Sequence, residues 1–494
     1  MTYPVAIHRL ETPSYPDSPP YHPHKAYPEY ATPGRAGPEN QVYDAVRDLF
    51  LRLGLDSEAA GTPAWNPLGS TIRPGDKVFL KPNMIAHKHT DSEAWIDVIT
   101  HGSVIRAVLD YVLIALQGEG AIAIGDAPQT DSDFDKIIDH MGLHELQKYY
   151  RDTLGFSIDI LDLRDERWIE KDGIYVETVN LEGDPRGSVS VNLGPLSHFS
   201  EWDGQNKNYY GAFYDTTETN RHHSGGRHEY AISRTPIDAD VFIGIPKLKT
   251  HKKCGLTANL KGLVGINANK NWLPHYCIGS PSEGGDQFPG NSAKGKLENQ
   301  IVLWMKQHLL KGNRAALFAA RKLKHVGYKV FGSTDEVVRS GNWHGNDTVW
   351  RMSVDLNRIL LYANSDGTLR SADSPKRFFS VVDGVIAMEG NGPVAGDPVS
   401  AGVLVAGDNP VSVDAVSAKL MGFDPSRLPI IHCNLDEHEL PLLRGGYEEI
   451  RTLSNHAPWE KRLNQWEARD SFSFRPHFGW TGQIEWRPEP TLQP

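Results

Sequence analysis

A dense group of basic side chains follows the short apolar run Val241–Ile245, which the pattern predicts to be a buried strand. The chain as a whole carries a formal net charge of −11, so this local concentration of cations is unusual. Repulsion among ammonium groups costs free energy unless an anion or facing carboxylates lie beside them. The group therefore predicts a site for a small anion, and its members are Lys247, Lys249, His251, Lys252, Lys253 and Lys261.

Alternation within this segment assigns roles to its members. Lys247, Lys249 and His251 are spaced by two, which in an extended segment places their side chains on one side. Histidine transfers protons near neutral pH, and lysine binds phosphate or carboxylate as a point charge. We expect His251 and Lys249 to be catalytic, and Lys247 and Lys261 to bind the anion. Lys252 and Lys253 are expected to form a solvated run.

Other predicted strands also end in polar residues, and ligands of open α/β sheets bind at the carboxyl ends of the strands. If the strands are parallel, we expect Lys81, Asn83 and Asn391 to bind substrate. Asp126 and Glu389 would act as partner acid and base or hold a divalent metal through carboxylate oxygens. An alternative role for Asp126 is to cap the helix that follows it. The polar ends are residues 81–83, 125–128, 389–393 and 407–409.

Two later loops, residues 269–289 and 341–352, combine tryptophan with amide, imidazole and carboxylate groups. Such loops are typical of surfaces that face a ligand, and we expect Trp343, Asn346 and Arg351 to contact the substrate. Alternatively, the tryptophans anchor a cap domain and the polar groups satisfy its backbone. The tract HHSGGRH at residues 222–228 indicates either a metal-binding tract or, as we favour, a flexible surface loop.

The elements that must position these residues alternate between short apolar runs and amphipathic helical patterns. This alternation predicts an α/β fold: a mostly parallel sheet core with an antiparallel β-rich insertion and a helical cap. The expected segments are an extended Pro-rich arm (1–40), the first part of the α/β core (41–167), the β-rich insertion (168–235), a core strand with the basic site loop (236–292), the helical cap (293–352), the second part of the α/β core (353–440) and an irregular C-terminal tail (441–494).

Composition excludes several classes of protein. The 39% of hydrophobic residues is typical of a globular chain, and the net charge of −11 argues against nucleic-acid and membrane-surface partners. No apolar run reaches membrane-spanning length and no apolar signal core opens the chain. The three cysteines, Cys254, Cys277 and Cys433, form no CxxC pair, so this chain alone cannot build an iron–sulfur cluster. Their scarcity fits a reducing compartment, and we expect a cytoplasmic protein.

Familiar signatures of catalysis are missing. The sequence holds no P-loop, no HExxH and no GxSxG motif. The segment Gly118–Gly120 precedes a predicted strand instead of following one, so it is not a dinucleotide fingerprint.

Several segments together resemble the domain-of-unknown-function 362 family: KVFLKPN, IGDAP, IPKLKTHKKCGLTANLKGLVGIN, NWLPHYCIGSPSEGGDQFP, GNWHGNDTVWRM and VVDGVIAMEGNGP. The resemblance runs from about Arg73 to His432, and PKLKTH and MEGNGP are its most specific parts. It implies that the residues at the strand ends form one site, but it carries no agreed reaction. Some members are fused to ferredoxin-like modules, which implies redox partners. This chain lacks the cysteines of such a module, so a redox role would need a separate protein.

These observations favour a cytoplasmic enzyme that acts on a small phosphorylated or carboxylated molecule by acid/base chemistry, with a possible divalent metal. One alternative is an accessory redox protein that works with an iron–sulfur or flavin partner. Another is a non-catalytic small-molecule binding protein.

Overall fold

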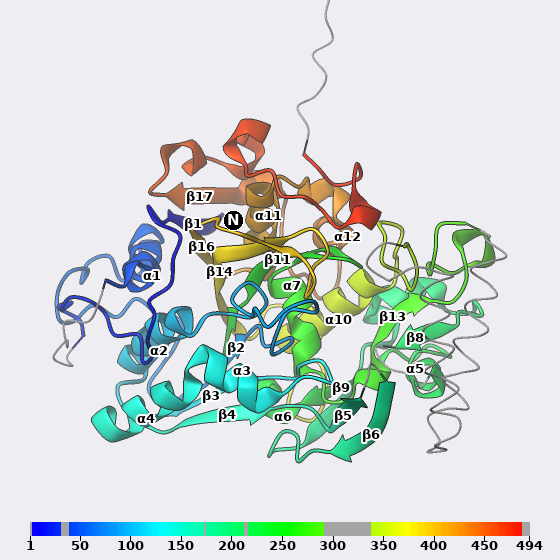
Figure 1. The fold of residues 1–494 in the computed structure, drawn as a ribbon, viewed down its shortest axis with the longest axis horizontal. Helices are drawn as coiled ribbons and strands as arrows, with labels where there is room; N and C mark the ends of the chain where they lie inside the picture. The colour runs from blue at the N-terminus through cyan, green and yellow to red at the C-terminus, as the bar shows by residue number, and fades with distance from the viewer. Residues whose placement is uncertain (1, 31–38, 172–173, 212–215, 291–336, 487–494) are drawn as a thin grey trace, which may run out of the picture.

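A central sheet organises the computed structural model, which describes residues 2–30, 39–171, 174–211, 216–290 and 337–486 (Figure 1). The strand order is β17-β1-β16-β14-β10-β2-β3-β4. Strands β4, β3, β2, β10 and β14 pair in parallel, whereas β16 runs antiparallel to both of its neighbours. The strands are β1 (Tyr3–Arg9), β2 (Lys77–Pro82), β3 (Ala121–Asp126), β4 (Ile158–Asp162), β10 (Val241–Ile245), β14 (Arg377–Glu389), β16 (Val403–Gly407) and β17 (Ile450–Ser454).

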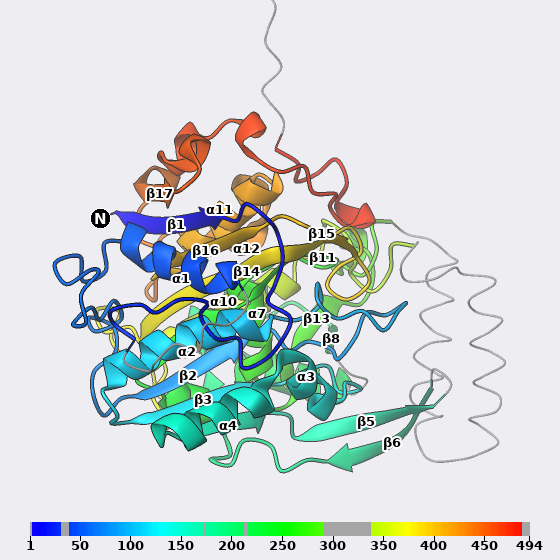
Figure 2. The same cartoon turned by 60° about the vertical axis from the view of Figure 1, so that its left-hand side comes forward.

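Helices cover both faces of this sheet, so the mostly parallel α/β core is confirmed (Figures 1 and 2). Side chains alternate along β10: Phe242 packs in one apolar core, and Val241 and Ile243 pack in the other. One face is covered by α1 (Gln41–Arg52), α2 (Gly102–Leu116), α3 (Phe134–Met141) and α4 (Leu143–Leu154). The opposite face is covered by α7 (Asn259–Gly262), α10 (Val349–Tyr362), α11 (Pro410–Met421) and α12 (Pro429–His432).

Two helices begin at asparagine residues whose side chains cap the helix N-terminus. The side chain of Asn409 accepts a hydrogen bond from the backbone N–H of Ser412, and Pro410 occupies the first turn of α11, where no N–H is needed. In the same way Asn40 caps α1 through the N–H of Tyr43. These caps fix where the helices start relative to the ends of the strands.

Three antiparallel strand pairs lie beside the core, which confirms the antiparallel insertion. They are β5 (Glu166–Lys171) with β6 (Ile174–Asn180), β7 (Ser188–Asn192) with β9 (Glu229–Ser233), and β8 (Tyr209–Gly211) with β13 (Pro274–Cys277). The last pair joins the insertion to a strand from the loop at residues 269–289. Two short helices, α5 (Thr216–His222) and α6 (Arg234–Asp238), complete this region.

The structure describes most of the expected arm and tail but little of the expected cap. The ranges 1–40 and 441–494 each supply one strand of the main sheet, β1 and β17, which pair with each other in parallel. Most of the expected cap (293–352), namely residues 293–336, lies outside the described residues; α10 begins near the end of the expected cap.

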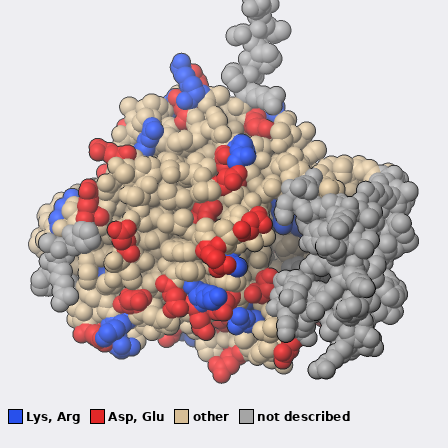
Figure 3. All heavy atoms as spheres, viewed as in Figure 1, with Lys and Arg blue, Asp and Glu red and all other residues tan. Residues whose placement is uncertain are grey.

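Surface charge and helix composition indicate which kinds of partner the protein could bind. Acidic and basic side chains are interspersed on the face shown in Figure 3. Among the helices that the structure describes, none is both long enough and apolar enough to serve as a membrane span.

Candidate functional site

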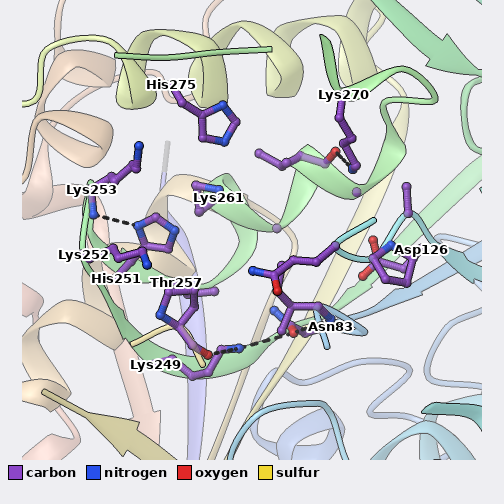
Figure 4. Close-up of a pocket in the computed structure, with 18 of the residues that line it drawn as sticks. Asn83, Asp126, Lys249, His251, Lys252, Lys253, Thr257, Lys261, Lys270 and His275 are labelled. Atoms are coloured by element: carbon purple, nitrogen blue, oxygen red, sulfur yellow. Dashed lines mark hydrogen bonds between the residues drawn. The ribbon is translucent and has the colours of Figure 1, made fainter. Parts of the chain in front are cut away.

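A cavity of about 550 Å³ opens where β2 and β3 end and where the chain continues from β10 into β11 (Lys247–His251) (Figure 4). Strand β11 pairs with β14 and with β12 (Gly255–Thr257). Strand β13 and helix α7 supply the opposite wall. The structure thus brings together five of the residues expected at the site, and adds four further basic side chains. The five are Asn83, Asp126, Lys249, His251 and Lys261; the additions are Lys252, Lys253, Lys270 and His275.

Asp126 lies at the floor of the cavity and forms an ion pair with Lys81 behind it; their side-chain atoms lie 2.9 Å apart and both side chains are almost fully buried. The second carboxylate oxygen of Asp126 accepts the backbone N–H of Met84 at 2.9 Å. Lys81 was expected to bind the anion, but its ammonium is the counter-ion of Asp126. Asp126 itself reaches the cavity, where it and Asp131 are the carboxylates among the described lining residues.

Lys249 is held rigidly beside the floor. Its buried ammonium donates to the carbonyl oxygens of Val98 at 2.7 Å and Pro393 at 3.1 Å, and to Oδ1 of Asn83 at 3.4 Å. These acceptors are neutral, so they do not compensate the charge as a carboxylate would. Burial, followed by the nearby charge of Lys247, lowers the pKa of Lys249 to about 7. An anion in the cavity would therefore supply the missing counter-charge.

Two further ammonium groups are held by backbone carbonyls. Lys270 donates to the carbonyl of Val264 at 3.0 Å, and burial lowers the pKa of Lys270 to about 7. Lys253 donates to the carbonyl of Ser340 at 2.6 Å and lies over the ring of Tyr276, 4.7 Å from its centre. Lys253 and Lys252 line the cavity, so the solvated run expected for this pair is instead part of the cavity wall.

His251 and His275 enter the cavity with different ring nitrogens available. Nδ1 of His251 accepts the backbone N–H of Lys253 at 3.1 Å, so the proton of the neutral ring is on Nε2. Nδ1 of His275 lies 2.9 Å from the carbonyl oxygen of Leu273, which only accepts, so Nδ1 carries the proton and Nε2 has a free lone pair. Burial and neighbouring lysines hold the pKa of both histidines well below its usual range. Each ring is therefore neutral: Nε2–H of His251 can donate a hydrogen bond, and the lone pair on Nε2 of His275 can accept a proton.

Lys261 reaches the cavity from helix α7. A carboxylate from the neighbouring helix α11, that of Asp414, accepts the backbone N–H groups of Asn259 and Leu260, each at 2.9 Å, and so fixes the start of α7. Figure 4 shows Lys261 between the rings of His251 and His275. In the described part of the chain, the ammonium of Lys261 has no hydrogen-bond or ion-pair partner.

Lys247 lies outside the cavity, contrary to the expectation from alternation. It is fully buried, 3.1 Å from the carboxylate of Asp383 and 2.7 Å from the hydroxyl of Tyr15. Lys247 lies opposite Asp383 on β14, whereas Lys249 lies opposite Met388. Lys247 is thus beside a buried carboxylate that binds it, whereas Lys249 and His251, farther along β11, reach the cavity.

Glu389 and Asn391 also lie elsewhere, at the end of β14. Both carboxylate oxygens of Glu389 bind Arg475, through the backbone N–H at 2.9 Å and through Nε at 2.6 Å. Asn391 lines a second cavity, of about 640 Å³, together with Arg475. Asp126 and Glu389 are each engaged with a cation and line different parts of the molecule, so they do not form the expected metal pair. Among the described residues, no group of three or more His, Cys, Asp or Glu side chains has the geometry of a metal site.

Trp343, Asn346 and Arg351 support the wall of the cavity and do not line it. Nε1 of Trp343 donates to the carbonyl of Asp286 at 2.8 Å. The amide of Asn346 donates to the carbonyl of His275 at 3.0 Å, which ties β13 to the start of α10. Arg351 pairs with Glu201 at 2.7 Å, away from the cavity. These contacts agree with the alternative interpretation of the loops, in which their side chains form hydrogen bonds to the backbone and anchor it.

The three histidines of HHSGGRH are buried, whereas residues 224–227 between them are exposed, so the surface loop that we favoured describes only the middle of the tract. The ring of His222 stacks on Trp272 with centres 3.3 Å apart, and His223 bonds to the carbonyl of Trp272 at 2.8 Å. His228 is 1% exposed. The tract packs the insertion against the segment that carries Lys270 and His275.

Lys270 and His275 are the site residues that the sequence did not single out as such. Both lie in the loop at residues 269–289, which was recognised as rich in functional side chains. Their distance in sequence from the lysine group concealed their proximity, because an antiparallel pairing of β13 with β8 brings them to the sheet.

Comparisons with known proteins agree with the resemblance. Residues 205–419 match the model of the family described as domain of unknown function DUF362. The thylakoid-associated protein sll1697 of Synechocystis sp. is 21% identical over 362 residues, which is 73% of this chain and 68% of that protein.

Two solved structures have a weaker similarity, each with a TM-score of 0.27 and 10% identity. A structural-genomics protein from Thermotoga maritima matches over 71% of this chain and 53% of its own. The lactate racemase apoprotein from Thermoanaerobacterium thermosaccharolyticum matches over 68% of this chain and 49% of its own. The chain thus spans about half the length of each, and similarity of this degree supports no inference about function.

Proposed function

We propose that the protein is an enzyme that binds a small carboxylated or phosphorylated molecule in the 550 Å³ cavity and moves a proton on it. The observation that carries this proposal is the charge of the cavity. Five lysines line it, and one of its two described carboxylates, Asp126, is already paired with Lys81. In a chain of net charge −11 such a cavity is unfavourable when empty and is stabilised by an anion.

The histidines supply the chemistry. Nε2–H of His251 donates a hydrogen bond that would stabilise negative charge developing on the substrate, and Nε2 of His275 accepts a proton; both reach the space where the anion would be held. This pair suits the removal of a proton from a substrate by His275 and its return. Asn83, whose Oδ1 contacts Lys249, would orient the ligand. Scarce cysteine supports a reducing compartment, and we place this activity in the cytoplasm.

The proposal can be tested without knowing the net reaction. The protein is incubated in D₂O with small carboxylates such as pyruvate, malate and lactate, and NMR follows the exchange of carbon-bound hydrogen for deuterium. We expect exchange on at least one of them, and we expect His251→Gln and His275→Gln to abolish it. His144→Gln, on the exposed surface of α4, is the matched control.

Other outcomes favour the alternatives. Exchange that persists in both histidine variants would refute the proton-transfer roles. Binding of these anions by calorimetry without exchange or turnover would favour a non-catalytic binding protein. Flavin absorbance or stoichiometric iron in freshly purified protein would favour an accessory redox role.

A further inference from the structure

Lys261 differs from the other lysines of the cavity whose contacts are described. Lys81 has a carboxylate partner, and Lys249 and Lys270 each donate to backbone carbonyls. Lys261 has none of these contacts in the described structure, although it extends from a helix start that Asp414 fixes in place. The backbone therefore positions Lys261, and its amine has no hydrogen-bond or ion-pair partner among the described residues.

The surroundings of Lys261 reduce the basicity of its amine. Burial lowers the pKa of Lys261 and the nearby ammonium of Lys81 adds to this, whereas Cys254 and Asp126 act in the opposite direction. A lysine made less basic by desolvation and by a neighbouring cation is the kind that attacks carbonyl carbon. The same cavity holds further cations that would hold a carboxylate, so the carbonyl group of an anionic molecule would be brought to the amine.

We propose that Lys261 forms an imine with the carbonyl carbon of a 2-oxo carboxylate. This inference rests on the proposed function and names its substrate class. The neutral Nζ attacks the carbonyl carbon, and the C=O electron pair moves to oxygen. One proton from the attacking nitrogen and one from a protonated lysine of the cavity, such as Lys249, convert that oxygen to water, which leaves; the nitrogen keeps its other proton and the donor lysine becomes a neutral amine. A C=N bond replaces the C=O bond, so the step needs no oxidant or reductant.

The imine would couple Lys261 to the two histidines. A protonated imine draws electrons from the adjacent carbon, which makes a hydrogen on that carbon more acidic. Nε2 of His275, the free lone pair in the cavity, takes that proton, and the C–H electron pair moves toward the imine nitrogen. Return of a proton and hydrolysis release the carbonyl compound and regenerate the amine of Lys261.

Reduction traps such an imine as a stable secondary amine. The full-length protein is treated with pyruvate or 2-oxoglutarate and cyanoborohydride, and peptide mapping by mass spectrometry locates the adduct. We expect one adduct per chain, on the peptide that carries Lys261, with protection by excess sulfate. Lys261→Arg keeps the positive charge but cannot form the imine, so the adduct should be lost. Lys136→Arg on the exposed side of α3 should leave it unchanged.

The result separates this inference from the proposed function. Adducts that are absent, spread over many lysines, or retained in Lys261→Arg overturn the imine. If the same protein still binds pyruvate by calorimetry and exchanges its hydrogens in D₂O, the proposed function stands without the imine. If binding and exchange are absent as well, both fail.

Discussion

Gly265 and Asp126 approach so closely that a methyl group on residue 265 would lie 1.6 Å from Oδ1 of the carboxylate. The carbonyl of Gly265 also accepts the backbone N–H of Ala127 at 2.8 Å, so neither segment can move away freely. Glycine at this position is thus what allows α7 and the turn after it to pack on the floor of the cavity.

Gly265→Ala is expected to destabilise the protein by about 1–3 kcal/mol, because the added methyl group displaces one member of a buried ion pair. Urea unfolding measures the difference. Gly262→Ala is the matched control, since a methyl group there meets no atom within 4 Å and alanine favours a helix. Equal stability of the two variants would contradict the close packing of Gly265.

Lys81→Met should lower the free energy of unfolding by about 3–5 kcal/mol, because it leaves Asp126 as a buried unpaired charge. A second change, Asp126→Asn, should recover part of this loss, since the remaining group is neutral. The exposed pair Lys148–Asp152 provides the comparison: Lys148→Met is expected to cost less than about 1 kcal/mol. A loss from Lys81→Met as small as that of the surface variant would rule out a buried pair.

Lys247→Met and Lys249→Met should have different effects although the two residues are neighbours on β11. Lys247 pairs with Asp383 inside the core, so its loss should lower stability by about 3–5 kcal/mol. Lys249 has no carboxylate partner among the described residues, so its removal should weaken sulfate binding more than stability. Calorimetry with sulfate and urea unfolding of both variants test this. Lys247→Met protein that stays stable but binds sulfate less well would contradict the buried pair and support an anion-binding role for Lys247.

Sulfate affinity should fall as the pH rises from about 6 to 8.5. Lys249 and Lys270 have pKa values of about 7, so both are protonated below this range and largely neutral above it. Sulfate stays a dianion throughout and selects the protonated lysines, so its affinity is greatest on the acid side. Binding should also be accompanied by proton uptake near pH 7, which calorimetry in buffers of different ionisation enthalpy detects. Affinity that rises with pH would exclude these lysines as the anion's partners.

Sequence patterns predicted the regular parts of this protein. Apolar runs alternating with helical periods identified β2, β3, β10 and β14, and strand-end polarity correctly grouped Asn83 with Asp126. The two-residue spacing of Lys247, Lys249 and His251 does not show which residues of other segments lie beside each of them. Lys247 lies opposite Asp383, inside the sheet, and pairs with that carboxylate instead of lining the cavity.

Long-range pairing was the other limit of the sequence. Strand β16 runs antiparallel to β14, so Asp408, which follows β16, lies at the opposite end of the strands from Asp126. The residue composition of β16 does not indicate in which direction this strand runs. Strands β1 and β17 pair across almost the whole length of the chain. The partnership of β13 with β8, which brings His275 to the cavity, also depends on contacts between distant segments.

The cavity is built by two parts of the chain that contribute different things. Strand β11, the turn after it and α7 supply His251 and four of the five lysines, whereas the segment of residues 270–277, tied to the insertion by the β8–β13 pair, supplies Lys270 and His275. Under the proposed function, a similar protein with the sheet but without this segment would retain most of the anion-binding lysines and lose the proton acceptor. The proposal therefore assigns recognition and turnover to different segments, and the identity of residue 275 would distinguish similar proteins that catalyse from those that only bind.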